Sequence, residues 1–119
     1  MKIKDNYFYG KWGRDLTLNK ILKQLRITLD PNRKYLIAED GARFMGKRVK
    51  EAILSELNSW GLNVCETKQE TLTPFAVREA VKNNFCSIII TAGSSPQAMM
   101  GFKVFDEKGN PHPEVGLNG

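Results

Sequence analysis

Hydrophobic residues recur at the spacing of an α-helix in three stretches of the chain. The first stretch can be capped by Asp15 or Thr17, and it ends before Pro31 because proline cannot continue the helical hydrogen bonds. The second covers about residues 46–60 and is closed by a glycine, and the third opens with a Thr-Pro pair. Their apolar faces consist of Leu18, Ile21, Leu22, Leu25 and Leu29; Val49, Ile53, Leu57 and Trp60; and Ala76, Val77, Ala80 and Val81.

Short apolar runs between and after these helices predict four buried strands, at about residues 35–38, 62–66, 87–91 and 102–106. The order α-β-α-β-α-β-β contains two βαβ units, which have right-handed crossovers and place helices on both faces of a sheet. We therefore expect an α/β fold, a three-layer α/β/α sandwich around a mixed, mainly parallel four-stranded sheet. The last strand follows a loop without a helix, so we expect it to be antiparallel and at an edge.

Composition is typical of one soluble domain, spanning residues 1–119, with 41% hydrophobic and 26% charged residues. The longest apolar run, residues 88–90, is far shorter than the ~20 residues that cross a bilayer, and the N-terminus has no signal-peptide core. Cys65 and Cys86 lack ligand spacing, and the only histidine, His112, lies in a Pro-flanked tail. We expect free thiols, no metal site, no membrane partner and a cytoplasmic location.

The net charge of +5 suits an anionic partner, either nucleic acid or a phosphorylated metabolite. For an excess this small, a solvated basic surface is the preferred interpretation. The chain has no aromatic RNA-binding strand motif, zinc-finger spacing or basic helix fork, so we expect no nucleic-acid partner.

The loop between the first predicted strand and the second helix contains GARFMGKR, residues 41–48, which has the spacing of a phosphate-binding P-loop. Arg48 stands where a Ser or Thr should hold magnesium. No later strand ends in the aspartate that holds the metal in nucleotide hydrolases, because residues 88–90 run into Thr91. We therefore interpret the segment as a glycine-bearing turn, and nucleotide hydrolysis is a third hypothesis that nucleotide titration tests.

Four segments in sequence order carry a resemblance to a known family. They are YGKWGRDLT, AEDGARFMGKRVKEAILSELNSWGLNV, TLTPFAVREAV and IIITAGSSPQAMMGFKVFDEKGNPHPEV. Together they resemble domain I of the α-D-phosphohexomutases, the phosphoglucomutase and phosphomannomutase family. The last segment is the most specific, because it is similar to the family's Ile-Thr-Ala-Ser-His-Asn-Pro, then Gly-Phe-Lys, then an acidic-glycine turn. The resemblance covers nearly the whole chain.

The resemblance implies an isomerase of carbohydrate metabolism that acts by intramolecular phosphoryl transfer on a hexose phosphate. In the family a phosphorylated serine gives its phosphoryl group to the sugar, and Mg²⁺ lies between that serine and aspartates of the second domain. By the same resemblance, Arg14, Arg43 and Lys103 bind phosphate or substrate, as fixed positive charges that neutralise a transferring phosphoryl group. Without the resemblance, Arg14 can be interpreted as a surface cation, and for Lys103 alone a strand residue that faces solvent is the preferred interpretation.

The sequence departs from the family where the chemistry takes place. Gly93 stands at the position of the phosphoserine, Ser94 replaces the family histidine and Ser95 the asparagine. Glycine has no side chain to phosphorylate, and misplacing a neighbouring hydroxyl by ~1 Å can already cost ~100-fold in rate. Family members also use three later domains that these residues do not contain, so we expect an isolated or truncated first domain.

We therefore expect the chain alone to be inactive and to hold no cofactor, with the missing mutase domains or another chain as partners. The alternative is a non-catalytic anion-binding, phosphosugar-binding or assembly domain. It would use Arg14, Arg43, Lys103 and the backbone amides of residues 93–95. Incubation with glucose 1,6-bisphosphate and magnesium distinguishes these two hypotheses. A phosphoserine at Ser94 or Ser95 would support an active mutase domain, and its absence would support the binding domain.

Overall fold

The computed structural model describes residues 2–4, 7–11, 13–40, 44–67, 73–92 and 99–111. In chain order the elements of this part are β1 (Lys2–Lys4), β2 (Tyr7–Lys11), α1 (Leu18–Thr28), β3 (Lys34–Asp40), α2 (Phe44–Ser59), β4 (Asn63–Glu66), α3 (Thr73–Lys82), β5 (Cys86–Ala92) and β6 (Met99–Phe105).

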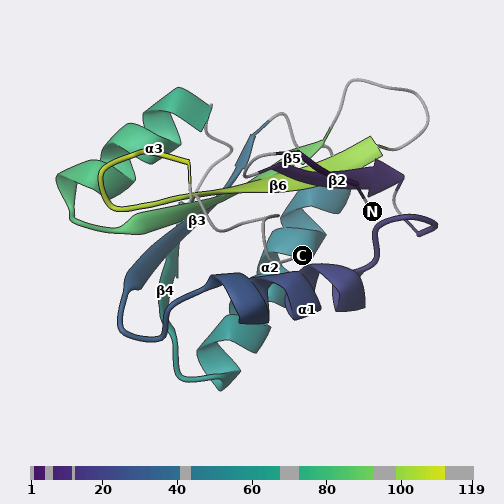
Figure 1. The fold of residues 1–119 in the computed structure, drawn as a ribbon, viewed down its shortest axis with the longest axis horizontal. Coiled ribbons are helices and arrows are strands. Elements are labelled where there is room, and N and C mark those ends of the chain that lie inside the picture. Colours follow the sequence, from purple (N-terminus) through teal and green to yellow (C-terminus); the bar gives the residue numbers. More distant parts are fainter. Residues whose placement is uncertain are drawn as a thin grey trace.

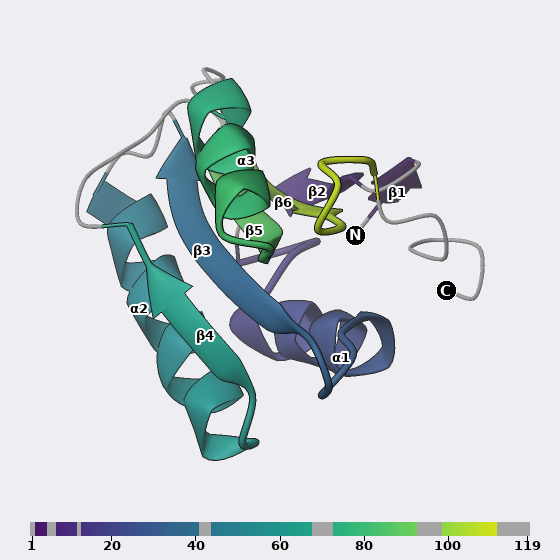
Figure 2. The same ribbon diagram turned by 90° about the vertical axis from the view of Figure 1, so that its left-hand side faces the viewer.

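Within the described ranges the strands form one six-stranded mixed sheet in the order β1-β2-β6-β5-β3-β4 (Figure 1). β3 pairs in parallel with β4 and with β5, and Figure 2 shows β3 and β4 side by side. The other three pairings, β1 with β2, β2 with β6 and β5 with β6, are antiparallel. The predicted βαβ units are present as β3-α2-β4 and β4-α3-β5.

The expectation of four strands is wrong in number, because the described sheet has six. The four predicted strands run as expected, with β3, β4 and β5 parallel and β6 antiparallel. The two additional strands, β1 and β2, are N-terminal and contain no continuous apolar run. In β2 alternate residues are buried, namely Phe8 and Gly10. β6 is antiparallel, as predicted, but it is not at an edge, because β2 pairs with its far side. β1 and β4 are the edge strands of the described sheet.

The sheet lies between two layers of helices, with α3 above it and α1 and α2 below it in Figure 1. The main core lies between the sheet and α1 and α2, where Phe8, Ile53 and Ile88 are fully buried. A smaller cluster, centred on Ala38, Ala76 and Ile89, packs α3 on the opposite face. The three-layer α/β/α sandwich is therefore confirmed.

The predicted helices are confirmed, with ends that follow local chemistry. The hydroxyl of Thr17 accepts a hydrogen bond from the backbone N–H of Lys20 and caps α1. Gly61 adopts a left-handed φ of 83° after α2, which is the conformation predicted for a glycine cap. No helix in the described part of the chain is long and apolar enough to cross a membrane. Cys65 and Cys86 are both free thiols, as expected.

Candidate functional site

The carboxyl ends of four strands meet at one edge of the sheet. Parallel pairing aligns Asp40, the last residue of β3, with Thr91 near the end of β5, and β4 ends at the same side with Glu66. β2 is antiparallel to β6 and β6 to β5, so β2 runs in the direction of β5, and its last residue, Lys11, pairs with Met99. The carboxyl ends of β3, β4 and β5 therefore lie at one edge of the sheet, and the turn after β2 lies at the same edge.

Arg14 lies in this turn and is exposed. The turn is tight: the backbone N–H groups of Arg14 and Asp15 both donate to the carbonyl of Lys11, at 3.1 and 2.9 Å. Gly13 has a φ of 87°, and a Cβ on Gly10 would lie 2.9 Å from the Cβ of Asp15. The two glycines thus allow the chain to fold back sharply, which places the backbone of Arg14 next to the strand-end edge.

Lys103 lies on the face of the sheet rather than at its edge. It pairs with Tyr7 on one side and with Ile89 on the other. Because directly opposed residues share a face and Ile89 packs under α3, Lys103 projects on the α3 side. It lies four positions along β6 from Met99, a distance of about 13 Å in a strand. Arg14 therefore lies in the turn at the edge of the sheet, whereas Lys103 lies further along β6, on the face that α3 covers.

A side-chain cluster that the sequence did not predict surrounds Lys103. The Tyr7 ring lies under its ammonium group, with 5.1 Å between Nζ and the ring centroid, and stacks on Tyr9 at 4.9 Å between centroids. The Tyr7 hydroxyl lies 3.4 Å from the hydroxyl of Thr91. A Cβ on Gly101 would be 2.6 Å from the Tyr7 ring, so only glycine lets the ring cross β6. The cluster connects Lys103 to the end of β5.

Asp40 has a structural partner at the same edge. Its Oδ2 accepts hydrogen bonds from the backbone N–H of Thr73, at 2.6 Å, and from the Thr73 hydroxyl. Thr73 is the first residue of α3, so a carboxylate from β3 satisfies an N-terminal donor of the helix and interacts favourably with its dipole. Asp40 therefore fixes the start of α3 against the end of β3.

A buried charge cluster lies on the other face, where α2 crosses β3 and β4. The ammonium of Lys50 is 3.4 Å from Glu39 Oε1 and 3.5 Å from Glu66 Oε2, and it donates to the carbonyl of Thr67 at 3.1 Å. The side chains of Lys50 and Glu39 are only 3% and 8% exposed. The sequence did not indicate this cluster, because a lysine in a helix normally reaches solvent. The spacing of Lys50 three residues before Ile53, on the apolar stripe, was the available signal.

The remaining predicted site residues, Arg43, Gly93, Ser94 and Ser95, lie outside the described residues, so their roles stay predictions. The described strand ends Ala92 and Met99 nevertheless fix where the segment 93–98 leaves and re-enters the sheet. Both lie at the edge that carries the Arg14 turn.

The described carboxylates do not form a metal site. No group of three or more His, Cys, Asp or Glu side chains in the described ranges is placed to hold a metal ion. Asp40 accepts hydrogen bonds from Thr73, and Glu39 and Glu66 share the ammonium group of Lys50.

Comparisons with known proteins agree with this architecture. Residues 15–115 match the family model of the phosphoglucomutase/phosphomannomutase α/β/α domain I. The crystal structure of a putative phosphomannomutase from Thermus thermophilus superposes with a TM-score of 0.78 at 22% sequence identity, over 92% of this chain. The match covers 26% of that protein, so the chain spans about a quarter of its length. No curated protein sequence matches significantly.

Proposed function

Because the chain belongs to the phosphoglucomutase/phosphomannomutase domain I family, we propose that it is the hexose-phosphate-binding first domain of a mutase-like protein and does not itself carry a phosphoryl group. The protein or assembly that contains it interconverts hexose 1- and 6-phosphates in the cytoplasm. In the alternative, the chain is a non-catalytic anion-binding or assembly domain. It would use the same phosphate-binding site but would not be part of a mutase.

One observation carries the proposal. The Arg14 turn and the end of β5 share one edge of the sheet, and the sequence that continues from Ala92 has glycine at the next position. In the family to which the chain belongs, this is where the phosphorylated serine is expected. Arg14 and Lys103, the cations that would bind the phosphate, are thus present. Gly93, in contrast, has no hydroxyl that could carry the phosphoryl group.

The arrangement suits binding of a phosphate ester next to a sugar. Arg14 offers several N–H donors in a fixed plane, and Lys103 offers a point charge directed by the Tyr7 ring. The hydroxyls of Tyr7 and Thr91 can donate to or accept from sugar hydroxyls. These groups orient a hexose phosphate, and a nucleophile for phosphoryl transfer has to come from Ser94, from Ser95 or from another chain.

Magnesium is expected in the complete mutase site, where it would offset charge on the phosphoryl group. The described carboxylates of this chain do not fit that role, because each one near the edge already has a partner. We propose that any magnesium ligands come from residues outside the described part of this chain or from another domain, and we derive no step through the ion.

Binding is tested by titrating the ¹⁵N-labelled chain with glucose 6-phosphate. We expect shifts at residues 13–15, Thr91 and Lys103, and we expect Arg14→Gln and Lys103→Met each to weaken binding about tenfold, the effect of losing one charged hydrogen bond. The matched control is Lys82→Met, which removes an exposed cation from the end of α3. Equal affinity in all three variants would rule out the site.

The missing nucleophile is tested by incubating the chain with glucose 1,6-bisphosphate and magnesium, followed by mass spectrometry of its peptides. We expect no phosphoserine at Ser94 or Ser95 in the natural chain. A stable phosphoserine at either position would show that a neighbouring hydroxyl replaces the lost one, and it would make the chain a phosphoryl carrier.

A further inference from the structure

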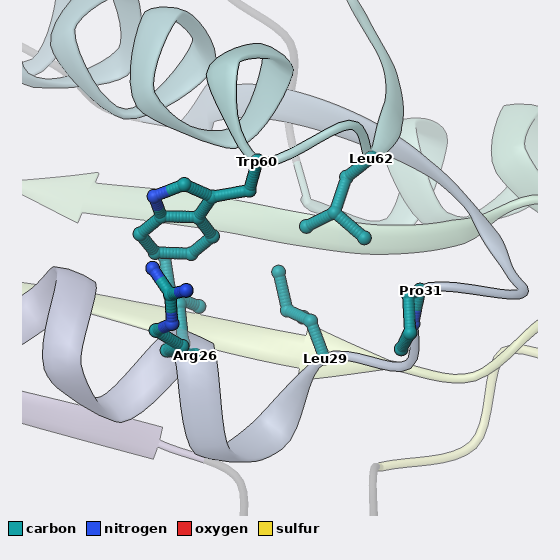
Figure 3. A pocket seen from close by; sticks show the side chains of 6 residues that line it. Arg26, Leu29, Pro31, Trp60 and Leu62 are labelled. Carbon is teal, nitrogen blue, oxygen red and sulfur yellow. The ribbon is translucent and has the colours of Figure 1, made fainter.

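The ends of α1 and α2 enclose a hollow at the end of the sheet where β3 and β4 begin, opposite the edge described above. It has a volume of about 210 Å³ and is lined by Leu25, Arg26, Leu29, Pro31, Trp60 and Leu62. Figure 3 shows Leu29, Leu62 and Pro31 on one side of the hollow and Trp60 with Arg26 on the other. Its floor is apolar, and it opens to solvent.

The wall formed by Trp60 is held in place by its neighbours. The guanidinium of Arg26 lies 4.8 Å from the centroid of the indole ring, a cation–π contact between α1 and the end of α2. Gly61, with its left-handed φ, reverses the chain immediately afterwards, so that Leu62 returns to the opposite side of the hollow. Contacts within the chain therefore fix the Trp60 side of the hollow.

A second hollow of about 490 Å³ continues the first along α1. It shares Arg26 and Trp60 with the first and adds Asn19, Lys20, Leu22 and Lys23. Together the two make one groove, here called the α1–α2 groove, with Trp60 and Arg26 at its centre. An apolar site is thus continuous with a strongly basic one.

The charge along this groove has a single sign. Lys20, Lys23 and Arg26 line it, and neither hollow has an acidic residue among its described lining residues. The α1 segment, LNKILKQLRIT, contains no Asp or Glu. The carboxylate of Asp30, next to Pro31, is paired with Arg33 at 3.5 Å.

We propose that the α1–α2 groove binds an acidic peptide segment that inserts one large apolar side chain beside Trp60. A cavity of roughly 150 Å³ can hold benzene, so a hollow of about 210 Å³ accommodates one leucine or phenylalanine side chain. Carboxylates on either side of this anchor then meet the three cations. Aromatic and arginine side chains around a small pocket are typical of the centres of protein interfaces.

A peptide fits this surface better than an anionic membrane does. Membrane-surface helices present their large apolar residues outward into the lipid. Here the indole of Trp60 lies against Arg26 and is only partly exposed, and the apolar floor is recessed between two helices. The surface is therefore concave where a membrane needs a protruding apolar face.

The test uses a fluorescein-labelled peptide, EELFEED, and the complete chain, with fluorescence anisotropy and the indole N–H signal of Trp60 as readouts. A Trp12→Phe variant assigns that signal. We expect saturable binding that shifts the Trp60 signal and weakens steeply as salt rises from about 0.01 M to about 1 M, because the Debye length falls from ~30 to ~3 Å. The peptides EEAAEED and KKLFKKK, which lack the anchor or reverse the charge, should not bind measurably.

Variants of the chain distinguish peptide binding in the groove from non-specific attraction to the net positive charge. Trp60→Ala should weaken binding about 30-fold, the size of an interface hot spot. Lys23→Glu, an exposed change that leaves the core intact, should weaken it about tenfold. The matched controls, Phe75→Ala and Lys82→Glu, alter an exposed aromatic residue and an exposed cation on α3 and should have no effect.

Two results would overturn the proposal. One is equal loss of affinity in Lys23→Glu and Lys82→Glu, because binding would then follow net charge alone. The other is binding to phosphatidylserine vesicles with a Trp60 shift, while EELFEED gives none, which would assign the groove to a membrane surface. Neither result bears on glucose 6-phosphate binding at the opposite edge, so the two proposals fail independently.

Discussion

The hydroxyl of Tyr7 lies 3.4 Å from the hydroxyl of Thr91, although 84 residues separate them in the chain. The contact crosses an entire strand, because β6 lies between β2 and β5. Glycine at position 101 leaves the space that the Tyr7 ring occupies. The first and last parts of the chain are thereby joined directly at the end of β5, where the family chemistry is expected.

Gly101→Ala should break this contact and destabilise the fold. The added Cβ would lie 2.6 Å from the carbonyl oxygen of Phe8 and 2.6 Å from the ring of Tyr7. The ring can rotate away but the backbone carbonyl cannot, so β2 must shift. We expect a loss of about 1–3 kcal/mol in the free energy of unfolding, the usual effect of overpacking, measured by urea denaturation.

Tyr7→Phe provides the matched control, because it removes the hydroxyl and keeps the ring. We expect it to cost only about 0.5–1.5 kcal/mol, the net value of one hydrogen bond, and to leave the ring-current shift on the side chain of Lys103. Gly101→Ala should abolish that shift. If both variants keep it, the ring does not depend on Gly101.

Helical periodicity predicted the three helices, and short apolar runs predicted the strands β3, β4, β5 and β6. β4 was predicted to be buried but is mostly exposed, because it is an edge strand of the described sheet. The strands β1 and β2 were missed because neither contains a continuous apolar run. β1 is Lys-Ile-Lys, and β2 alternates between half-buried and buried residues. Tyr7, Phe8 and Tyr9 alternate between the two faces, and this was the readable signal. Once β2 is recognised, β6 cannot be an edge strand.

The candidate site was predictable only where it depends on local sequence. Gly10 and Gly13 belong to the first of the four segments that resemble the family, and the structure has a tight turn there, with Arg14 exposed after the end of β2. Its role in phosphate binding stays a prediction. The partners of Tyr7 and Lys50 could not be read from the sequence, because they come from segments far apart in the chain and depend on strand order and register.

Lys50→Met should destabilise the protein strongly. Without the ammonium group, Glu39 remains buried beside α2 with no counter-charge, and breaking one side of a buried pair typically costs about 3–5 kcal/mol. Chemical denaturation measures the loss. The double variant Lys50→Met/Glu39→Leu should recover most of it, because the unpaired charge is gone. If the double variant is no more stable than Lys50→Met, the pair is not the source of the effect.

Asp40→Ala should loosen the start of α3 while the rest of the sheet stays folded. The variant removes the acceptor for the backbone N–H of Thr73, and losing such a helix-start acceptor costs about 1 kcal/mol. Amide hydrogen exchange should therefore accelerate in residues 73–76 and not in α1. Thr17→Ala is the matched control, since it removes the cap of α1 and should show the opposite pattern.

The two cysteines should differ in reactivity and in their effect on stability at alkaline pH. Cys65 is exposed, whereas Cys86 is buried and its thiol lies 3.3 Å from Glu107 Oε2, to which it donates. Burial, together with this hydrogen bond, raises the pKa of Cys86 from 9.0 to about 11. The folded state therefore holds the thiol proton more tightly than the unfolded state does.

The stability that Cys86 contributes is fully present below pH 9 and is lost as the pH rises through about 11. Tyr35, whose pKa burial raises from 10.0 to about 12, acts in the same direction at higher pH. We expect the melting temperature to fall between pH 9 and 11, and to fall less in Cys86→Ala. A disulfide reagent at neutral pH should label Cys65 in the native chain, whereas the Cys65→Ser variant should react only after unfolding. Rapid labelling of native Cys65→Ser would show that Cys86 is accessible.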